Sequence, residues 1–329
     1  MGSAISAVIV VNRARRRASH RPGLYFRVPR VELLVVGEAY EDLIFVGLPR
    51  LPKAGEELRS AHYASTIGGG AVITAVAAAR LGVRTVVVSA LSAEASRRLR
   101  SERIGVANLM RPREHHAVTV ALSTSDDRSF VTFNGVNDRL EPRLLKALRY
   151  QKARHVHFAL APQRIDRWLR VLDRFRADGV TTSWDFGWNP PLRDRAGFGR
   201  LISAVDVVFM NEVEATMYAR VRRETRNTVI KLGSRGSRWV SGAFDITAPA
   251  PRVAAVDTTG AGDAFNGGFL CAFLDGRPPR ECLRLGNYVG AQSTRAAGGV
   301  NALPTRPARP SRPTRPTRPS RPSRPIRRP

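Results

Sequence analysis

The sequence predicts an α/β protein: a doubly wound, mostly parallel sheet with helices on both faces and a small β-sheet that forms a lid. From residue 31 to about 303, apolar runs of strand length alternate with helix-like segments, a rhythm typical of parallel sheets. Residues 117–135 break this rhythm, because apolar and polar side chains alternate on either side of "SDDR". That pattern predicts a half-buried antiparallel hairpin. With the extended stretch at residues 43–67, the hairpin is expected to form the lid.

The first half of the chain supplies two core strands and two helices. Residues 31–37 are apolar and β-branched and predict a buried strand, followed by a polar loop. Residues 71–82 are helix-like and stop at Gly82, a natural C-cap. Residues 83–91 predict the next buried strand, and residues 92–105 a polar helix that ends at Gly105.

The second half repeats the alternation. Residues 153–161, 163–179 and 180–187 predict strand, helix and strand in turn. Residues 201–219 and 228–240 continue the pattern, which extends the predicted parallel sheet.

Charge divides the chain into three parts. The formal net charge is +27, yet residues 1–30 hold seven arginines and no acid, and residues 304–329 hold nine arginines and no acid. The remaining 31–303 therefore carries +27 − 7 − 9 = +11 and is the expected folded domain. The first segment is expected to be a disordered basic extension. The last repeats Arg-Pro, which excludes helix and sheet, so we expect a disordered tail whose contact with nucleic acid is at most weak and electrostatic.

Cysteine and histidine usage argues against disulfides and metal clusters. Only Cys271 and Cys282 occur, with no CxxC pair, which favours a reducing, cytoplasmic location. No apolar stretch is long enough to span a membrane. His115-His116 and the pair His155 and His157 lack acidic or thiol partners at metal spacing, so they are interpreted as structural or surface residues.

The stretch "DTTGAGDAFNGGFL", residues 257–270, carries the clearest chemistry. Gly260-Ala261-Gly262 opens an apolar helix, and a glycine-rich turn there leaves backbone N–H groups free to bind an anion. Asp263 follows directly, although a carboxylate should repel an anion. The conflict is resolved if Asp263 accepts a proton while the N–H groups hold developing negative charge. The helix N-terminus should keep Asp263 ionised at neutral pH.

Other polar residues fall where predicted strands end, and the carboxyl ends of parallel strands share one edge of the sheet. Neither a P-loop nor a dinucleotide fingerprint is present in the sequence. The expected rim residues are Asp42, Gly68 to Gly70, Asp185, Asn211 to Glu214, Gly233 to Gly236, and Asp257 to Asp263.

Two of these segments, "GGGAVITAVAAARLG" and "DTTGAGDAFNGGFL", resemble the signatures of ribokinase-like (PfkB-type) carbohydrate kinases, and the resemblance extends over residues 31–302. It implies an ATP-dependent phosphotransferase that acts on a small sugar or related alcohol. Asp263 matches the general base of the family. The backbone of Gly260, Ala261 and Gly262 matches its anion hole for the transferred phosphoryl group.

The resemblance also implies the donor site. Asn211 and Glu214 match an N-x-x-E element that orders Mg²⁺ and the phosphates through water. Asp257 and Thr259 match positions that hold a monovalent cation, K⁺, in many members. The residues implied to border the nucleotide are Lys231, Gly233, Arg235, Gly236 and Asn287.

The implied acceptor site consists of Asp42, Gly69, Gly70 and Ile73 together with Asp263. The family usually has an asparagine at the position of Ile73, and the ribokinases proper have one at the position of Tyr40. Isoleucine cannot donate to a sugar hydroxyl, so the acceptor side is expected to be altered.

Three functions stay open from the sequence. The leading one is phosphorylation of a hydroxymethyl group of a small sugar. The second is a nucleoside kinase of the same fold, which a flatter, more apolar acceptor site would suit. The third is a sugar- or nucleotide-binding regulatory protein without turnover, against which the retained Asp263 and its turn argue. A homodimer through the lid is also expected.

Overall fold

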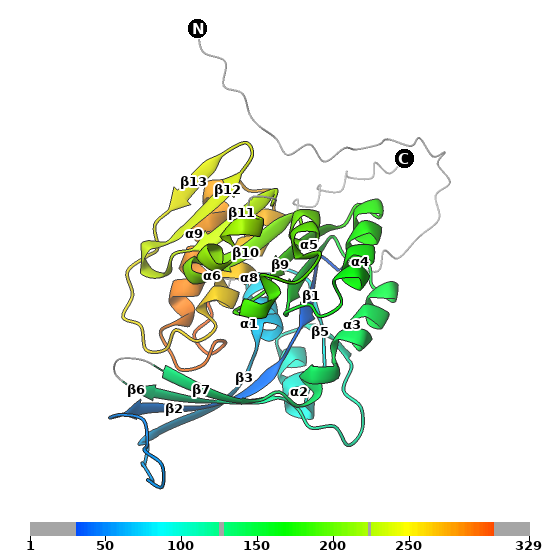
Figure 1. The fold of residues 1–329 in the computed structure, drawn as a ribbon. Helices are drawn as coiled ribbons and strands as arrows, with labels where there is room; N and C mark the ends of the chain where they lie inside the picture. Colours follow the sequence, from blue (N-terminus) through cyan, green and yellow to red (C-terminus); the bar gives the residue numbers. More distant parts are fainter. Residues whose placement is uncertain (1–30, 125–127, 223–224, 306–329) are drawn as a thin grey trace, which may run out of the picture.

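The computed structural model describes residues 31–124, 128–222 and 225–305. The predictions for residues 1–30 and 306–329 therefore lie outside the described residues. Within the described part, a large sheet of nine strands is covered by helices on both faces, and a sheet of four strands lies beside it (Figure 1). This architecture confirms the predicted fold class.

The large sheet runs β13-β12-β11-β10-β9-β8-β1-β4-β5. Its pairings are parallel from β5 to β11, and only the edge strands β12 and β13 pair antiparallel. The order changes direction at β1, between β8 and β4, as in doubly wound sheets. The strands are Leu33–Gly37 (β1), Thr85–Ser89 (β4), Gly105–Asn108 (β5), His155–Ala159 (β8), Thr181–Asp185 (β9), Val207–Asn211 (β10), Asn227–Lys231 (β11), Ser237–Ser241 (β12) and Asp245–Ala248 (β13).

Two hydrophobic clusters cover the two faces. Successive side chains of a strand point to opposite faces, so Leu33 and Val35 join one cluster and Leu34 and Val36 the other. The first cluster packs against α1 (Gly70–Arg80), α2 (Ala93–Ser101), α8 (Ala261–Leu274) and α9 (Pro279–Ser293). The second packs against α3 (Glu141–Ala147), α4 (Ile165–Ala177), α5 (Phe198–Ala204), α6 (Glu212–Met217) and α7 (Ala219–Arg222).

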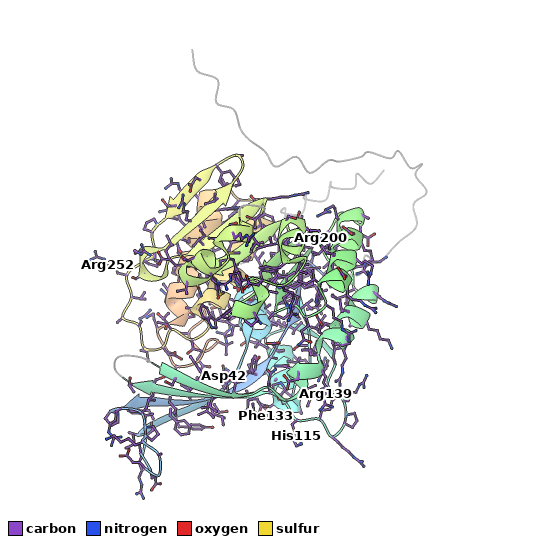
Figure 2. All side chains as sticks on the ribbon, in the orientation of Figure 1. Asp42, His115, Phe133, Arg139, Arg200 and Arg252 are labelled. Carbon is purple, nitrogen blue, oxygen red and sulfur yellow. The ribbon has the colours of Figure 1, made fainter. Side chains whose placement is uncertain are left out.

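The small sheet has the order β3-β2-β6-β7 and is the predicted lid. Its strands are Tyr40–Leu48 (β2), His62–Gly68 (β3), Val118–Thr124 (β6) and Arg128–Phe133 (β7). The predicted hairpin is the antiparallel pair β6–β7. Figure 2 shows Asp42 where this sheet meets the main domain, and Phe133 close to His115, with ring centroids 6.5 Å apart.

Two element predictions were wrong. The segment after residue 37 was expected to be a polar loop but forms strand β2. Although Glu41 and Asp42 are polar, the alternation of buried and partly exposed side chains continues along the strand through the buried Ile44. The polar helix after residue 92 ends at Ser101, and Gly105 starts β5. At Gly105 an added Cβ would lie 2.8 Å from Val86 Cγ2, so this glycine permits close strand pairing rather than capping a helix.

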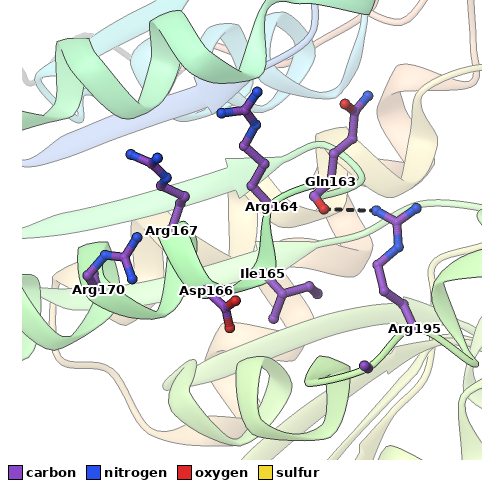
Figure 3. A pocket seen from close by; sticks show the side chains of 8 residues that line it. Gln163, Arg164, Ile165, Asp166, Arg167, Arg170 and Arg195 are labelled. Atoms are coloured by element: carbon purple, nitrogen blue, oxygen red, sulfur yellow. Dashed lines mark hydrogen bonds between the residues drawn. The ribbon is translucent and has the colours of Figure 1, made fainter.

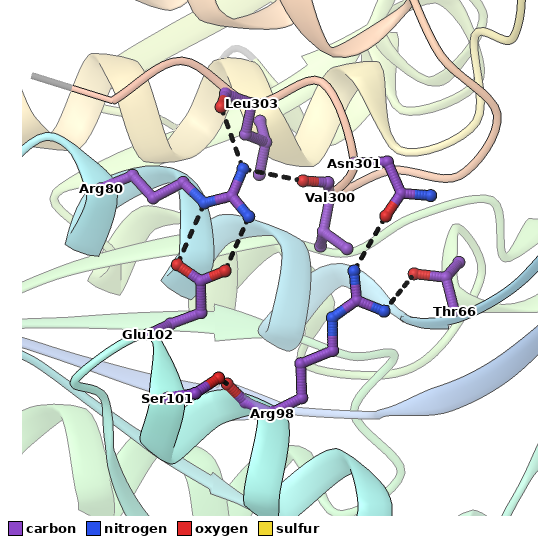
Figure 4. A network of polar contacts seen from close by, with 8 residues as sticks. All are labelled: Thr66, Arg80, Arg98, Ser101, Glu102, Val300, Asn301 and Leu303. Atoms are coloured by element: carbon purple, nitrogen blue, oxygen red, sulfur yellow. Dashed lines mark hydrogen bonds and ion pairs between the residues drawn. The ribbon is translucent and has the colours of Figure 1, made fainter.

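Arginines on α1 and α2 bind the segment that follows α9, and Arg98 also binds the lid (Figure 4). Arg80 pairs with Glu102 at 2.6 Å and donates to the carbonyls of Val300 and Leu303 at 3.0 and 2.9 Å. Arg98 donates to Thr66 Oγ1 on β3 at 3.2 Å and to Asn301 at 2.8 Å. The lid strand β3 is therefore anchored to the main domain by charged hydrogen bonds.

Candidate active site

A cavity of about 440 Å³ opens at the carboxyl ends of β1, β8 and β9, within the size range of small-molecule sites. This is the edge at which a doubly wound sheet binds its ligands. Both the main domain and the segments flanking the lid strands contribute to its wall. The lining residues are Glu38, Tyr40, Gly70, Asn134, Ala159 to Ala161, Asp185 to Asn189, and Asp263.

Asp263 lines this cavity in the first turn of α8, directly after the predicted anion-binding turn. Gly260 is the N-cap of α8 and has φ of 70°, a left-handed conformation that glycine adopts without strain. The Ala261 N–H makes a long bond of 3.3 Å to the Thr258 carbonyl. Within the described part of the chain, the N–H groups of Gly260 and Gly262 donate to no protein oxygen, which leaves them free to bind an anion.

Neighbouring residues fix the position of Asp263. Thr74 Oγ1 on α1 donates to its backbone carbonyl at 3.1 Å. A Cβ added at Gly70 would lie only 3.1 Å from Asp263 Oδ1, so glycine at this position leaves room for the carboxylate. The N-termini of α1 and α8 thus meet at the acid.

The ionisation of Asp263 differs from the sequence prediction. Burial, and then the negative charge of Asp185, raises the pKa of Asp263, and Lys231 opposes both; together these effects raise the pKa to about 7. The helix N-terminus therefore does not keep the acid fully ionised at neutral pH, and that prediction was wrong. A pKa near 7 suits a general base that operates near neutral pH.

A buried ion pair lies beside the turn. Lys231 Nζ, at the end of β11, donates to Asp185 Oδ2 at 2.6 Å, and Asn266 Nδ2 donates to the same oxygen at 2.7 Å. Burial alone would raise the pKa of Asp185, but Lys231 and Asn266 hold it below its usual range. A Cβ placed at Gly262 would lie 3.1 Å from Lys231 Nζ, so the ammonium group adjoins the anion-binding turn.

Asn211 and Glu214 form a capping box on α6. The Asn211 side chain accepts from the Glu214 N–H, and Glu214 Oε2 accepts from the Asn211 N–H, both at 2.8 Å. Burial, and then the charge of Asp185, raises the pKa of Glu214. The motif thus has a local structural role, and it also places a carboxylate next to the Lys231–Asp185 pair.

The described residues hold no group of three or more His, Cys, Asp or Glu side chains arranged as a metal site. Mg²⁺ in kinases is commonly held by one or two carboxylates together with phosphates and water. Glu214 and Asp185 fit that kind of site, because they lie close enough for the charge of Asp185 to raise the pKa of Glu214.

The remaining residues implied for the nucleotide border the loop after β11. Gly233 has φ of 61° and Gly236 has φ of 104°, and a Cβ on Gly236 would lie 2.1 Å from the Ala248 carbonyl oxygen. Arg235 is exposed and pairs with Glu212. Asn287 Nδ2 donates to the carbonyls of Ala248 and Pro249 at 2.9 and 3.2 Å, which joins α9 to the end of β13.

Four residues implied for the acceptor lie in different places. Gly70 lines the cavity. Gly69 lies against the backbone of Glu38, since a Cβ at Gly69 would lie 2.7 Å from the Glu38 carbonyl oxygen. Ile73 is buried, and a Cβ at Gly260 would lie 2.4 Å from its Cδ1. Asp42 is buried against Gly68, and burial with the charge of Asp257 raises its pKa to about 6. Neither Ile73 nor Asp42 is among the residues that line the cavity.

The two residues implied for a monovalent cation hold loops together. Asp257 Oδ1 accepts from the Thr259 N–H at 2.9 Å and from its hydroxyl at 2.6 Å. Asp257 Oδ2 accepts from the Gly298 N–H at 2.8 Å. The carboxylate thereby ties the turn before α8 to the segment after α9.

Among the cavity residues that the sequence analysis did not predict are Glu38, Asn134, Trp188 and Asn189. Glu38 follows β1, and Trp188 and Asn189 follow β9, so the rule that ligands bind at strand ends could have found them. Asn134 follows the lid strand β7 and reaches the cavity only through the pairing of the lid. The sequence carries no local signal for that contact.

A second cavity, of about 420 Å³, lies at the start of α4 (Figure 3). Figure 3 shows Arg164, Arg167 and Arg170 pointing in different directions, while Arg195 Nη1 donates to the Gln163 carbonyl at 3.0 Å. The arginines are exposed and do not converge on a common point. The cavity that contains Asp263 is therefore the better candidate for the active site.

The fold agrees with comparisons to known proteins. The model of the pfkB family of carbohydrate kinases matches residues 31–306. A ribokinase of Arabidopsis thaliana is 26% identical over 305 residues, covering 83% of this chain and 79% of the relative. An ATP-dependent ribose-1-phosphate kinase of Halopiger xanaduensis is 28% identical over 289 residues, covering 84% and 95%.

The fold also matches solved structures. A putative ribokinase II of E. coli in complex with ATP and Mg²⁺ superposes with a TM-score of 0.71 at 18% identity, covering 83% of this chain and 96% of that one. No helix in residues 31–124, 128–222 or 225–305 combines the length and the apolar character needed to cross a membrane. The match over residues 31–306, with the predicted signatures at the cavity, establishes the chain as a member of the pfkB family of carbohydrate kinases.

Proposed function

We propose that this kinase transfers the γ-phosphoryl group of ATP to a hydroxymethyl group of a small sugar or sugar-like alcohol, with Asp263 as the general base. One observation carries the proposal. The Asp263 carboxylate lines a cavity of small-molecule size and directly follows a turn whose Gly260 and Gly262 N–H groups donate to no protein oxygen in the described chain. A proton acceptor and an anion site are adjacent, as phosphoryl transfer to an alcohol requires.

In the proposed reaction the acceptor hydroxyl oxygen attacks the γ-phosphorus. Its proton passes to the Asp263 carboxylate, the bond between the γ-phosphorus and the bridging oxygen breaks, and ADP leaves with the electron pair. The backbone of Gly260, Ala261 and Gly262 stabilises the negative charge of the transferred group, and Lys231 supports it from the end of β11. Because the N-terminus of α1, at Gly70, packs against Asp263, the base is held in position before the substrate binds.

For the donor, we propose that ATP lies over the loop from Lys231 to Gly236 and toward Asn287. Glu214 and Asp185 would hold Mg²⁺ through water. Held by these residues, the ion would supply positive charge to offset that of the phosphates. K⁺ bound beside Asp257 and Thr259 is part of the proposal and is tested by comparing turnover in potassium and sodium buffers.

The direct test is a screen of acceptor-dependent ADP release with sugars and nucleosides, followed by identification of the product. We expect ADP release that depends on an alcohol and a product phosphorylated on its hydroxymethyl oxygen. If no acceptor stimulates ADP release while sugars or ATP still bind, the chain is a binding protein that has lost turnover.

We also propose that the lid forms a homodimer. Apolar side chains of the lid are exposed: Tyr63 by 59%, Val131 by 65% and Phe133 by 57%. Exposed apolar groups of this size mark association surfaces. Light scattering of the protein should report twice the chain mass, and Val131→Lys should reduce it to that of the monomer.

A further inference from the structure

The charges around the acceptor cavity are unevenly balanced. Beside Asp263 lie the N–H groups of the turn and the Lys231 ammonium group, which suit the transferred phosphoryl group. Glu38 lines the same cavity. No lysine, arginine or histidine is among the residues that line the cavity in the described part of the chain. An acceptor in this cavity therefore meets the Glu38 carboxylate with no cationic lining residue to offset it.

Hydrogen bonds leave Glu38 with unused accepting capacity. The Tyr40 hydroxyl lies 2.7 Å from Glu38 Oε2 and 3.2 Å from Asn134 Oδ1, and its single proton serves the shorter contact. Among the described residues, the other carboxylate oxygen of Glu38 has no hydrogen-bond partner. Burial raises the pKa of Glu38, and the negative charge of Asp138 adds to that effect while Tyr40 opposes it. A donor or a positive charge from a ligand would stabilise this partly buried carboxylate.

An aromatic side chain lies at the mouth of the same cavity. Trp188 follows β9 in the loop after Asp185, and 64% of its surface is exposed. The other three tryptophans, Trp168, Trp184 and Trp239, are buried. An exposed indole beside a cavity offers a flat apolar face to a ring, and tryptophans of this kind often serve as binding contacts.

From these observations we propose the acceptor class: a ring-shaped polyol without an acidic group, whose hydroxyl or amino donors bind Glu38 and whose ring face rests on Trp188. This inference rests on the proposed function, because it describes the acceptor of the same site. It excludes sugars that carry a phosphate or a carboxylate remote from the phosphorylated hydroxymethyl group, since such a group would share the cavity with Glu38 and no cationic lining residue would balance the two charges.

The first test uses acceptor pairs that share their hydroxymethyl group. Ribose is compared with ribose 1-phosphate, and glucose with glucosamine and glucose 1-phosphate. We expect kcat/KM for each 1-phosphate to be lower than for its parent sugar by on the order of 100-fold, since like charges repel across a desolvated site. Glucosamine should be at least as good as glucose. A 1-phosphate that matches or exceeds its parent would overturn the inference.

The second test changes the wall. Glu38→Gln keeps the shape and removes the charge, so it should reduce the ratio of kcat/KM for ribose to kcat/KM for ribose 1-phosphate by about 10-fold. The matched control is Glu281→Gln, because Glu281 is an exposed residue on α9. This variant should leave the ratio of kcat/KM unchanged. An unchanged ratio in Glu38→Gln would remove Glu38 from acceptor selection.

Binding supplies a readout that does not need turnover. Ribose should change the tryptophan fluorescence of the wild-type protein, ribose 1-phosphate should not do so at the same concentration, and Trp188→Phe should abolish the change. Phosphoryl transfer that favours anionic acceptors would overturn this inference alone. Absence of transfer to every acceptor would contradict the proposed function, and the fluorescence titration would still decide the acceptor class.

Discussion

Lys231→Met tests the buried ion pair at the centre of the site. The Lys231 and Asp185 side chains are only 13% and 9% exposed, and 2.6 Å separates Nζ from Oδ2. Removing one partner of a buried pair leaves an uncompensated charge and typically costs about 3–5 kcal/mol. Asn266 still donates to Asp185 at 2.7 Å, so the lower part of that range is expected.

Urea unfolding at pH 7 measures the loss as a change in the free energy of unfolding. Adding Asp185→Asn to Lys231→Met should restore part of the stability, because an amide needs no counter-charge. Lys146→Met, an exposed residue on α3, is the control and should change the free energy by less than about 0.5 kcal/mol. A loss below about 1 kcal/mol for Lys231→Met, or strictly additive effects in the double variant, would refute the reasoning.

Three further predictions follow from the same contacts. Because Asp263 acts as a base only when deprotonated and its pKa is about 7, kcat/KM should rise with pH and level off above about pH 8; a profile that is flat between pH 5.5 and 8.5 would contradict this. Gly70→Ala places a Cβ 3.1 Å from Asp263 Oδ1 and should lower kcat by about 10-fold or more, whereas Gly242→Ala, with nothing within 4 Å, should not change kcat. Ile73→Asn puts an amide where the side chain is 2% exposed, so it should lower the free energy of unfolding, measured by heat or urea, by roughly 2–5 kcal/mol. Improved turnover of a polar sugar without that loss of stability would show instead that position 73 reaches the acceptor.

The parallel sheet was predictable because its signal is local. Strands buried on both faces, such as β1 and β8, appear as short apolar runs, and each is followed by a helix-like segment. The lid strand β2 was missed as a strand because it starts with Tyr40, Glu41 and Asp42, whose polarity indicates a loop. Only its pairing with β3 and β6, distant in sequence, makes this segment a strand.

The anion-binding turn was predictable for the same reason, since Gly260 to Asp263 form one continuous segment. The ionisation of Asp263 was not, because its raised pKa depends on burial and on the charges of Asp185 and Lys231, which come from two other strands. Asp42 and Ile73 were expected at the acceptor from their positions in the signatures. Their burial against Gly68 and Gly260 follows from tertiary packing, which no motif encodes.

The central claim is that Asp263 is the catalytic base, and Asp263→Asn tests it most directly. The asparagine keeps the shape of the side chain and cannot accept the proton, so kcat should fall by about 10²–10⁴-fold while ATP still binds. Turnover and nucleotide affinity should be measured on the same preparation, with unfolding by urea to show that the variant is folded. A folded variant with near-normal kcat would contradict the account, and loss of ATP binding would show that Asp263 supports the donor site rather than proton transfer.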